Sequence, residues 1–330
     1  MLSAPTSNPL RVLDPVDTMI SLTELLQRAI ATLSGAGIAN PSVDAELLVG
    51  HVLGLSRGGV QAKAVTGTIV PADELATIEQ LVERRAAREP LQHITGRAAF
   101  RQLELAVGPG VFVPRPETEF VAQFAIDALR ATASPEPVGV DLGMGSGAIA
   151  LAMATEVAHS RIYGVEVSPR AFVWARQNFI TVNAPNATAV FIDLAHALPS
   201  LDGSVDVVIS NPPYIPLGAI PRDPEVRLFD PEIALYGGDD GLDVVRQVSA
   251  TALRLLHRGG SLVLEHGELQ AAEIAALLVH DGWTAIAHHR DLLGVIARRR
   301  RCAKTQAWPT PLARAWAKVS IAASIPEAEP

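Results

Sequence analysis

The sequence predicts an α/β fold, with a mostly parallel, doubly wound sheet that follows a small bundle of helices. Three observations carry this prediction. Residues 19–90 show only the helical spacing of apolar residues. From about residue 114 onward, short β-branched runs alternate with helical patterns, as in a parallel sheet covered by helices. One of these runs leads through a glycine-rich turn directly into a helix, which is typical of nucleotide-binding α/β folds.

Length and composition limit the classes of protein. A chain of 330 residues is long enough for two domains of about 150 residues. Its 48% hydrophobic and 19% charged residues support a sizeable core and exclude global disorder. No apolar run approaches the roughly 20 residues needed to cross a bilayer. The one cysteine, Cys302, excludes a disulfide framework and a multi-cysteine metal site, so no metal is expected.

Charge and the first residues bear on partners and location. Residues 111–290 carry 21 acidic and 11 basic residues, whereas nucleic-acid enzymes usually surround their sites with positive charge. The balance disfavours DNA or RNA as the main partner. Met1–Asp17 holds prolines and acids where a signal peptide needs a basic start and an apolar block. We therefore expect a cytoplasmic protein without a membrane partner, and a disordered leader over residues 1–18.

The segment 19–90 is expected to be a helical domain. Three helices are expected, the first from Ser21 to about Gly35, the second opened by Asn40-Pro41-Ser42, and the third over Pro71–Glu89. Such helices pack on one another or on a partner. No residue here forms a chemical constellation, and His51 is read as a surface or packing histidine.

Residues 91–113 are expected to form a linker that contains a β-hairpin. The alternation of Leu103, Leu105 and Val107 predicts a strand that pairs with the segment before it. Phe100 is read as a packing residue. The next helix begins at or just before Thr118. We read its neighbours Arg115, Glu117 and Glu119 as a solvated helix start, because acids are favoured at the positive end of the helix dipole.

The glycine-rich turn follows the predicted strand Val138–Leu142 and spans Gly143-Met144-Gly145-Ser146-Gly147. Glycines let the backbone approach a ligand closely, and the following helix offers free N–H groups. The spacing is G-x-G-x-G, whereas dinucleotide-binding folds prefer G-x-G-x-x-G. Asp141 precedes the turn, and its charge would repel a pyrophosphate but suit an amino-bearing ligand.

Two further acids follow predicted strands. Glu166 ends the strand Arg161–Val167, at the place where an acid binds ribose hydroxyls. Asp193 follows the strand Ala189–Ile192, where it can accept a hydrogen bond from an adenine amino group. The glycine turn and these acids in this order favour a nucleoside ligand. The alternative is that they are surface acids at strand ends.

The most distinctive stretch is Asn211-Pro212-Pro213-Tyr214, which follows the buried strand Val205–Ile209. Two prolines supply no backbone N–H, so the strand must stop there. Ligands bind at the carboxyl ends of such strands. The Asn211 side-chain oxygen and the Pro212 carbonyl can accept both hydrogens of an amino or amide nitrogen, with Tyr214 packing on its face. The alternative is a proline-rich turn without function.

The rest of the chain completes the α/β alternation. The long loop Gly218–Leu242 follows the Asn-Pro-Pro-Tyr stretch and is expected to rim the same pocket. The later elements are expected to be a helix over Val244–Leu256, a strand over Ser261–Leu264, a helix over Leu269–Val279, and strands near Thr284–Ala287 and Gly294–Ala297. Residues 298–330, which begin with Arg298–Arg301, are expected to be a flexible tail with a solvated arginine run.

Several motifs in this order resemble the peptide chain release factor glutamine methyltransferase (HemK/PrmC) family. These enzymes are class I S-adenosylmethionine-dependent methyltransferases. The resemblance covers about residues 22–297. Its motifs are Leu91-Gln92-His93-Ile94-Thr95-Gly96, Pro114-Arg115-Pro116-Glu117-Thr118-Glu119, Asp141 to Gly147, Asn211-Pro212-Pro213-Tyr214-Ile215 and Gly237-Gly238-Asp239-Asp240-Gly241. Asn-Pro-Pro-Tyr alone also occurs in amino-directed nucleic-acid methyltransferases, and its combination with the other motifs is more specific.

The resemblance implies a Rossmann-like, seven-stranded methyltransferase domain over residues 114–297 and a substrate-docking role for the helical domain. It implies transfer of methyl from S-adenosylmethionine to the glutamine side-chain nitrogen in the Gly-Gly-Gln motif of release factors, leaving S-adenosylhomocysteine. The implied cofactor-binding residues are Asp141, Gly143, Met144, Gly145, Ser146, Gly147, Glu166, Asp193, Leu194 and Asn211. The implied substrate-binding residues are Asn211, Pro212, Pro213 and Tyr214, and of these Asn211, Pro212 and Tyr214 would be catalytic.

The chain departs from the family at two places. Met144 stands where the family usually has a small hydroxyl residue, and an arginine run replaces the usual Gly-x-x-Arg lead into the final strand after Asp291-Leu292. Three other functions stay open. A ribosomal-protein glutamine methyltransferase shares the same catalytic signature. A DNA or RNA amino methyltransferase is disfavoured by the acidic central segment. A cofactor-binding regulator without activity is disfavoured by the intact Asn-Pro-Pro-Tyr stretch.

Overall fold

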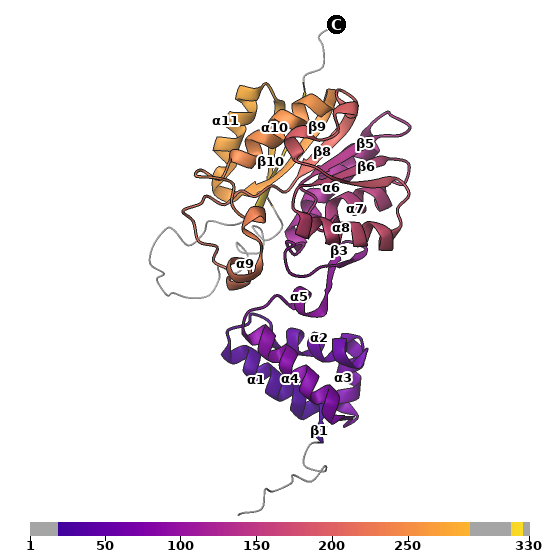
Figure 1. Ribbon diagram of the computed structural model, residues 1–330, viewed down its shortest axis with the longest axis vertical. Helices are drawn as coiled ribbons and strands as arrows, with labels where there is room; N and C mark the ends of the chain where they lie inside the picture. Colours follow the sequence, from indigo (N-terminus) through magenta and orange to yellow (C-terminus); the bar gives the residue numbers. More distant parts are fainter. Residues whose placement is uncertain (1–18, 291–317, 326–330) are drawn as a thin grey trace, which may run out of the picture. The chain divides into compact units, whose positions relative to one another are not determined.

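The computed structural model describes residues 19–290 and 318–325. The chain forms two compact units, which divide between Thr95 and Gly96. Figure 1 shows the first unit as helices and the second as a sheet with helices on its faces. The predicted leader, the expected strand Gly294–Ala297, the arginine run and Cys302 lie outside the described residues.

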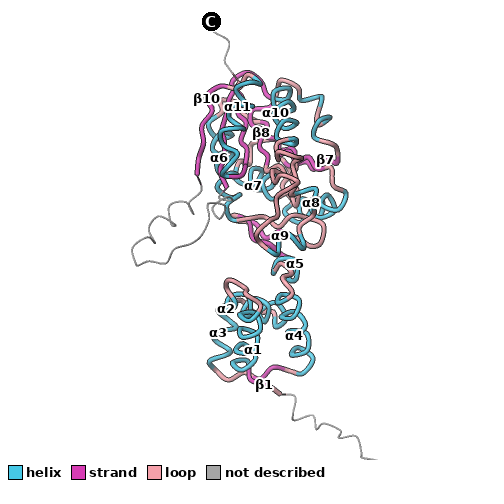
Figure 2. Tube along the Cα trace, turned by 90° about the vertical axis from the view of Figure 1, so that its left-hand side faces the viewer, coloured by secondary structure: helices cyan, strands magenta, loops and turns pink. Residues whose placement is uncertain are grey.

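The first unit is built mainly from helices, as the apolar spacing predicts. Its elements are β1 (Ile20–Ser21), α1 (Leu22–Gly35), α2 (Pro41–Leu53), α3 (Arg57–Val65), β2 (Ile69–Val70), α4 (Ala72–Ala86) and α5 (Leu91–Thr95). The two short strands pair antiparallel, and β1 lies at one end of the helices (Figure 2). The three expected helices are confirmed. The sequence analysis did not predict α3, which has Gly58 and Gly59 in its first turn, or the single turn of α5.

The core of this unit is apolar with one ion pair inside it. Fully buried leucines and isoleucines from α1, α2 and α4 form the core, among them Leu22, Leu48 and Ile78. The Arg85 guanidinium donates to the Asp44 carboxylate across 2.8 Å, and both residues are buried. The pair joins α2 to α4, and loss of either partner would leave an uncompensated buried charge.

The second unit is organised around a seven-stranded sheet. Its strands are β5 (Val138–Leu142), β6 (Arg161–Glu166), β7 (Ala187–Phe191), β8 (Val205–Ser210), β9 (Leu256–Gly267), β10 (Thr284–Arg290) and β11 (Lys318–Ser324). Their order is β10-β11-β9-β8-β5-β6-β7. The four pairs from β9 to β7 are parallel, and β11 pairs antiparallel with both β9 and β10. The prediction of a mostly parallel, seven-stranded sheet is confirmed.

The strand β11 corrects the prediction for the end of the chain. We expected residues 298–330 to be a flexible tail, yet Lys318–Ser324 forms a seven-residue strand between β9 and β10. Its register runs from Lys318 opposite Gly267 to Ser324 opposite Ser261. Both β9 and β10 offer backbone hydrogen-bond partners to β11. A sequence with only a moderate preference for strand can therefore form a strand here.

Helices cover both faces of the sheet (Figure 1). One face packs against α10 (Asp243–Leu255) and α11 (Ala271–Asp281), and the other against α6 (Pro116–Ala131), α7 (Ala148–Glu156) and α8 (Pro169–Val182). This arrangement is doubly wound, as expected. Strands buried on both faces explain why the sequence reads as continuous apolar runs rather than as alternation. In the described part of the chain, every helix is too short or too polar to span a membrane.

The predicted hairpin is confirmed as β3 (Arg97–Phe100) paired with β4 (Leu103–Ala106), and it belongs to the second unit. Phe100 is fully buried in the core that α6 and α7 share, as a packing residue should be. Arg101, at the tip of the hairpin, binds both oxygens of the Glu156 carboxylate on α7 and donates to Gln123 on α6 across 2.6 Å. The hairpin is therefore bound to two helices of the second unit.

Candidate active site

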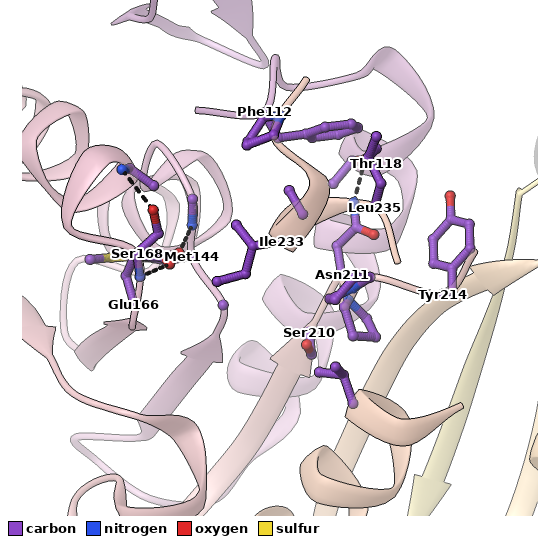
Figure 3. Close-up of a pocket in the computed structure, with 18 of the residues that line it drawn as sticks. Phe112, Thr118, Met144, Glu166, Ser168, Ser210, Asn211, Tyr214, Ile233 and Leu235 are labelled. Atoms are coloured by element: carbon purple, nitrogen blue, oxygen red, sulfur yellow. Dashed lines mark hydrogen bonds between the residues drawn. The ribbon is translucent and has the colours of Figure 1, made fainter. Parts of the chain in front are cut away.

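A cavity of about 500 Å³ lies at the carboxyl ends of the parallel strands. The ends of β5, β6 and β8 contribute to it, together with the start of α6 and part of the segment 221–235 (Figure 3). Most of the accessible lining is apolar, with carboxylates and amides at defined places. Such a position at the strand ends of an open α/β sheet is where ligands bind.

The glycine turn after β5 has the backbone that glycine makes possible. Gly143, Gly145 and Gly147 all have positive φ angles, at 78°, 57° and 87°. The N–H groups of Gly143 and Met144 both donate to the Val165 carbonyl at 2.9 Å, which ties the turn to β6. Gly143, Met144, Gly145 and Ser146 line the cavity.

The structure shows how methionine fits at position 144, where the family usually has a small hydroxyl residue. The Met144 side chain is buried, and a Cβ added to Gly164 of β6 would lie 2.3 Å from the Met144 sulfur. The thioether therefore occupies the space that Gly164 leaves open. The large side chain is accommodated by this packing, and Met144 still lines the cavity.

Glu166 ends β6 with its carboxylate at the wall of the cavity (Figure 3). One oxygen accepts from the N–H groups of Val167 and Ser168 at 3.0 and 2.7 Å, and the other accepts from Gly145 at 2.9 Å. Burial raises the pKa of this carboxyl, and the three backbone donors oppose that shift. The side chain thus holds the glycine turn against β6 and still offers acceptor positions to a ligand.

Asp141 was expected to face a ligand beside the glycine turn, and the structure places it differently. Its side chain is fully buried, and among the described residues it is not part of the cavity lining. One carboxylate oxygen accepts from the Ala150 N–H at 3.0 Å. It therefore caps the first turn of α7, whose N-cap residue Gly147 has no side chain. Burial raises the pKa of Asp141 to about 7, and the hydrogen bond from the Ala150 N–H opposes that shift.

Gly147 is also absent from the described lining, since it packs against Phe179, with an added Cβ lying 2.8 Å from that ring. Asp193 and Leu194 do line the cavity, beyond the end of β7. The Asp193 carboxylate accepts from the Ala195 N–H at 2.8 Å and is exposed. One of its oxygens is thereby used for a local turn.

Asn211, Pro212, Pro213 and Tyr214 all line the cavity immediately after β8. The Ser210 hydroxyl donates to the Leu142 carbonyl at 2.7 Å, so the end of β8 is fixed to the end of β5, where the glycine turn starts. The Asn211 Nδ2 donates to the Thr118 hydroxyl at 3.4 Å (Figure 3). Because its nitrogen faces Thr118, the Asn211 oxygen is the atom that can accept from a ligand.

The start of α6 shows what the sequence reasoning missed. Arg115 is not a solvated residue: it lines the cavity, and its guanidinium donates at 3.0 Å to Asp230, whose side chain is fully buried. It also lies over the Phe112 ring at 5.1 Å, which is a cation–π contact. Burial raises the pKa of Asp230 to about 6, and the Arg115 charge opposes that shift. Glu119, read as solvated too, accepts from the Arg101 N–H at 3.0 Å.

The Pro114–Glu119 motif could have indicated that this helix start is functional. It does not reveal the partners of Arg115 and Thr118, which lie more than 90 positions away in the sequence. The segment Gly218–Leu242 rims the cavity, as expected, through residues such as Asp223, Ile233 and Leu235. It is not only loop, since α9 (Pro224–Phe229) and a 3₁₀ turn over Glu232–Ala234 lie within it.

Comparison with known proteins finds the same two parts. Residues 24–96 match the family described as PrmC N-terminal domain, and residues 102–220 match the methyltransferase small domain. The chain is 48% identical to the release factor glutamine methyltransferase of Streptomyces coelicolor over 273 residues, which cover 82% of this chain and 94% of that one. Identity to the enzyme of the same name from Mycolicibacterium smegmatis is 44%, over 84% of this chain and 95% of that one.

A third relative has another name. The 4-amino-L-phenylalanine/4-methylamino-L-phenylalanine methyltransferase of Streptomyces pristinaespiralis is 38% identical over 262 residues, which cover 78% of this chain and 87% of that one. The Streptomyces coelicolor and Mycolicibacterium smegmatis matches cover more of this chain and are more similar to it. The resemblance seen in the motifs is confirmed, and the chain belongs to the release factor glutamine methyltransferase family.

Proposed function

We propose that this protein transfers the methyl group of S-adenosylmethionine to the side-chain amide nitrogen of the glutamine in the Gly-Gly-Gln motif of peptide chain release factors. Family membership supports the reaction and the substrate class. The observation that carries the assignment is the place of Asn211, whose amide lies in the cavity with its nitrogen engaged by Thr118. A substrate in translation termination implies that the protein acts in the cytoplasm.

The glycine-turn half of the cavity fits S-adenosylmethionine. The Glu166 carboxylate at the end of β6 suits the two hydroxyls of a ribose, and the turn from Gly143 to Ser146 leaves room for the methionine part. Leu194 and Asp193 would border the adenine. When bound, the cofactor supplies a methyl group on a positively charged sulfur, which an uncharged nitrogen can attack.

The chain's own contribution is to hold the attacking nitrogen. A carboxamide nitrogen is a weak nucleophile because its lone pair is delocalised into the carbonyl. Accepting both N–H bonds, at the Asn211 oxygen and the Pro212 carbonyl, fixes the orientation of the nitrogen and raises its electron density. The Ser210 bond to Leu142 holds this acceptor pair at a constant distance from the glycine turn, which is what near-attack alignment needs.

No residue needs to remove a proton before transfer. Once the nitrogen has gained the methyl group it is cationic, and its proton becomes acidic enough to leave to solvent. Tyr214 contributes an aromatic wall beside the acceptor pair (Figure 3). The acceptor pair, the ring and the glycine turn therefore account for the reaction by positioning, with no strong base.

A second candidate is methylation of a free arylamine, which the Streptomyces pristinaespiralis relative favours. An arylamine nitrogen is also planar, conjugated and equipped with two N–H donors, so the acceptor pair alone does not exclude it. The two substrates differ in size, since one is a small molecule and the other a loop of a protein.

The test is incubation of the purified full chain with a purified release factor and methyl-labelled S-adenosylmethionine, followed by mass mapping of the modified residue. We expect one methyl group on the Gly-Gly-Gln glutamine. A parallel reaction holds 4-amino-L-phenylalanine in place of the release factor. Labelling of the arylamine without labelling of the release factor would reverse the choice between the two candidates.

A further inference from the structure

We propose that Gln270 is a positioning residue for methyl transfer: its carboxamide fixes the backbone of the Asn-Pro-Pro-Tyr stretch. Gln270 is buried and ends the 3₁₀ turn Glu268–Gln270 that leads into α11. Among the described residues it does not line the cavity, so it acts through Tyr214 rather than on the substrate. The kinetic part of this inference rests on the proposed function.

Two hydrogen bonds define the orientation of the Gln270 side chain. Its Nε2 donates to the Tyr214 carbonyl at 2.9 Å, and its Oε1 accepts from the Gly267 N–H at 3.2 Å. A backbone N–H only donates and a carbonyl only accepts, so the two partners determine which end of the carboxamide faces which. The side chain therefore connects the end of β9 to the end of the Asn-Pro-Pro-Tyr stretch, 56 residues away.

The stretch needs such support because of its prolines. Pro212 and Pro213 have no N–H, so neither can be held by donating to a neighbouring strand. The backbone after them is held instead, through the Ile215 N–H on the Leu235 carbonyl and the Gly237 N–H on the Ile215 carbonyl, both at 2.9 Å. The bond from Gln270 to the Tyr214 carbonyl adds a fixed point only two residues beyond the Pro212 carbonyl.

The glycine motif Gly237–Gly241 makes room for this bond. A Cβ on Gly241 would lie 2.4 Å from the Tyr214 carbonyl oxygen and 2.8 Å from Gln270 Nε2. A Cβ on Gly237 would lie 2.5 Å from the Pro213 carbonyl oxygen. Side chains at either place would displace the backbone that Gln270 holds. The motif and Gln270 therefore form one support beneath the acceptor pair.

A purely structural role for Gln270 is separable from this one. Its bond to Gly267 is half of a capping box, which stabilises the start of a helix. Glutamate at this position keeps an oxygen for the Gly267 N–H but replaces the donor at Tyr214 with a second oxygen. Methionine removes both bonds at similar volume. If capping is the whole role, Gln270→Glu resembles the wild type and only Gln270→Met is impaired.

The experiment compares wild type, Gln270→Glu, Gln270→Met and Gln177→Glu at pH 8, where a glutamate side chain is ordinarily ionised. Gln177 is exposed on α8, so its variant is a control for the added charge. We expect kcat for release factor methylation to fall about tenfold or more in both Gln270 variants, the order expected for a misplaced reacting group. The KM for S-adenosylmethionine should stay within about twofold of wild type, because the glycine turn is untouched.

Amide hydrogen exchange gives a second readout that does not depend on the substrate. The Ile215 and Gly237 N–H groups should exchange faster in both Gln270 variants than in wild type or Gln177→Glu. Wild-type kcat and unchanged exchange in Gln270→Glu would overturn the inference. A rise in the KM for S-adenosylmethionine that matches the loss of kcat would overturn it as well. A wild type that methylates no release factor counts against the proposed function, and the exchange result then decides the inference alone.

Discussion

Replacing Thr118 by valine isolates the contact that orients Asn211. Thr118 is 4% exposed, and its hydroxyl accepts from Asn211 Nδ2 at 3.4 Å. Valine fills nearly the same volume but offers no acceptor. The Asn211 amide is then free to turn over, and a turned amide presents N–H groups to a substrate that needs an oxygen.

The magnitude follows from the strength of one neutral hydrogen bond. A net contribution of about 1 kcal/mol corresponds to a loss of roughly fivefold in kcat for Thr118→Val. The assay is methylation of a purified release factor at saturating S-adenosylmethionine. The KM for the cofactor should not change, because Thr118 lies at the start of α6 and not at the glycine turn.

Thr118→Ser is the matched control. Serine restores the hydroxyl but removes a methyl group, so kcat should return to within about twofold of the wild type. A Thr118→Val variant with the full wild-type kcat would refute the reasoning. So would a Thr118→Ser variant as slow as Thr118→Val, since the loss would then come from packing.

Three further predictions concern other parts of the second unit. Asn211→Ala should lower kcat by about a hundredfold or more in the same assay while the midpoint of thermal unfolding changes little, because it removes the polar transition-state contact that we propose for Asn211; near-normal methylation would contradict the assignment. Arg101→Ala should reduce the free energy of unfolding by about 2 kcal/mol in urea titration, since it leaves the largely buried Glu156 carboxylate without its bidentate partner; an unchanged midpoint would show that the hairpin is held by packing alone. Asp141 has a pKa raised by burial from 3.8 to about 7, so the folded state binds its proton more tightly and the stability that this gives is lost as pH rises from about 4 to about 7. Asp141→Asn should flatten the fall of the unfolding midpoint across that window, and an identical pH profile in the variant would show that Asp141 does not cause it.

Much of the site was predictable because it depends on short stretches of chain. Two consecutive prolines end a strand wherever it lies, so Asn211 could be placed at the tip of β8 from the sequence alone. The glycine turn is equally local, since positive φ angles at Gly143 and Gly145 require glycine or a strained residue. Glu166 follows from its position at the end of the next strand.

What could not be predicted depends on contacts between distant residues. The sequence places Asp141 next to the turn, but only the packing of α7 above β5 decides that its carboxylate faces Ala150 instead of a ligand. Arg115 looks like a charged residue in a solvated helix start until Asp230, 115 positions later, is brought beneath it. The strand Lys318–Ser324 has no strong pattern of its own and is specified by pairing with β9 and β10.

The central claim is that an oxygen of Asn211 and the carbonyl of Pro212 hold a carboxamide nitrogen opposite the methyl donor. The most direct measurement is a crystal structure of the full chain with S-adenosylhomocysteine and a peptide that contains Gly-Gly-Gln. We expect the glutamine nitrogen within hydrogen-bonding distance of both oxygens and on the side that faces the sulfur. A peptide glutamine seated with its carbonyl oxygen toward Asn211, or bound away from Pro212, would contradict the account.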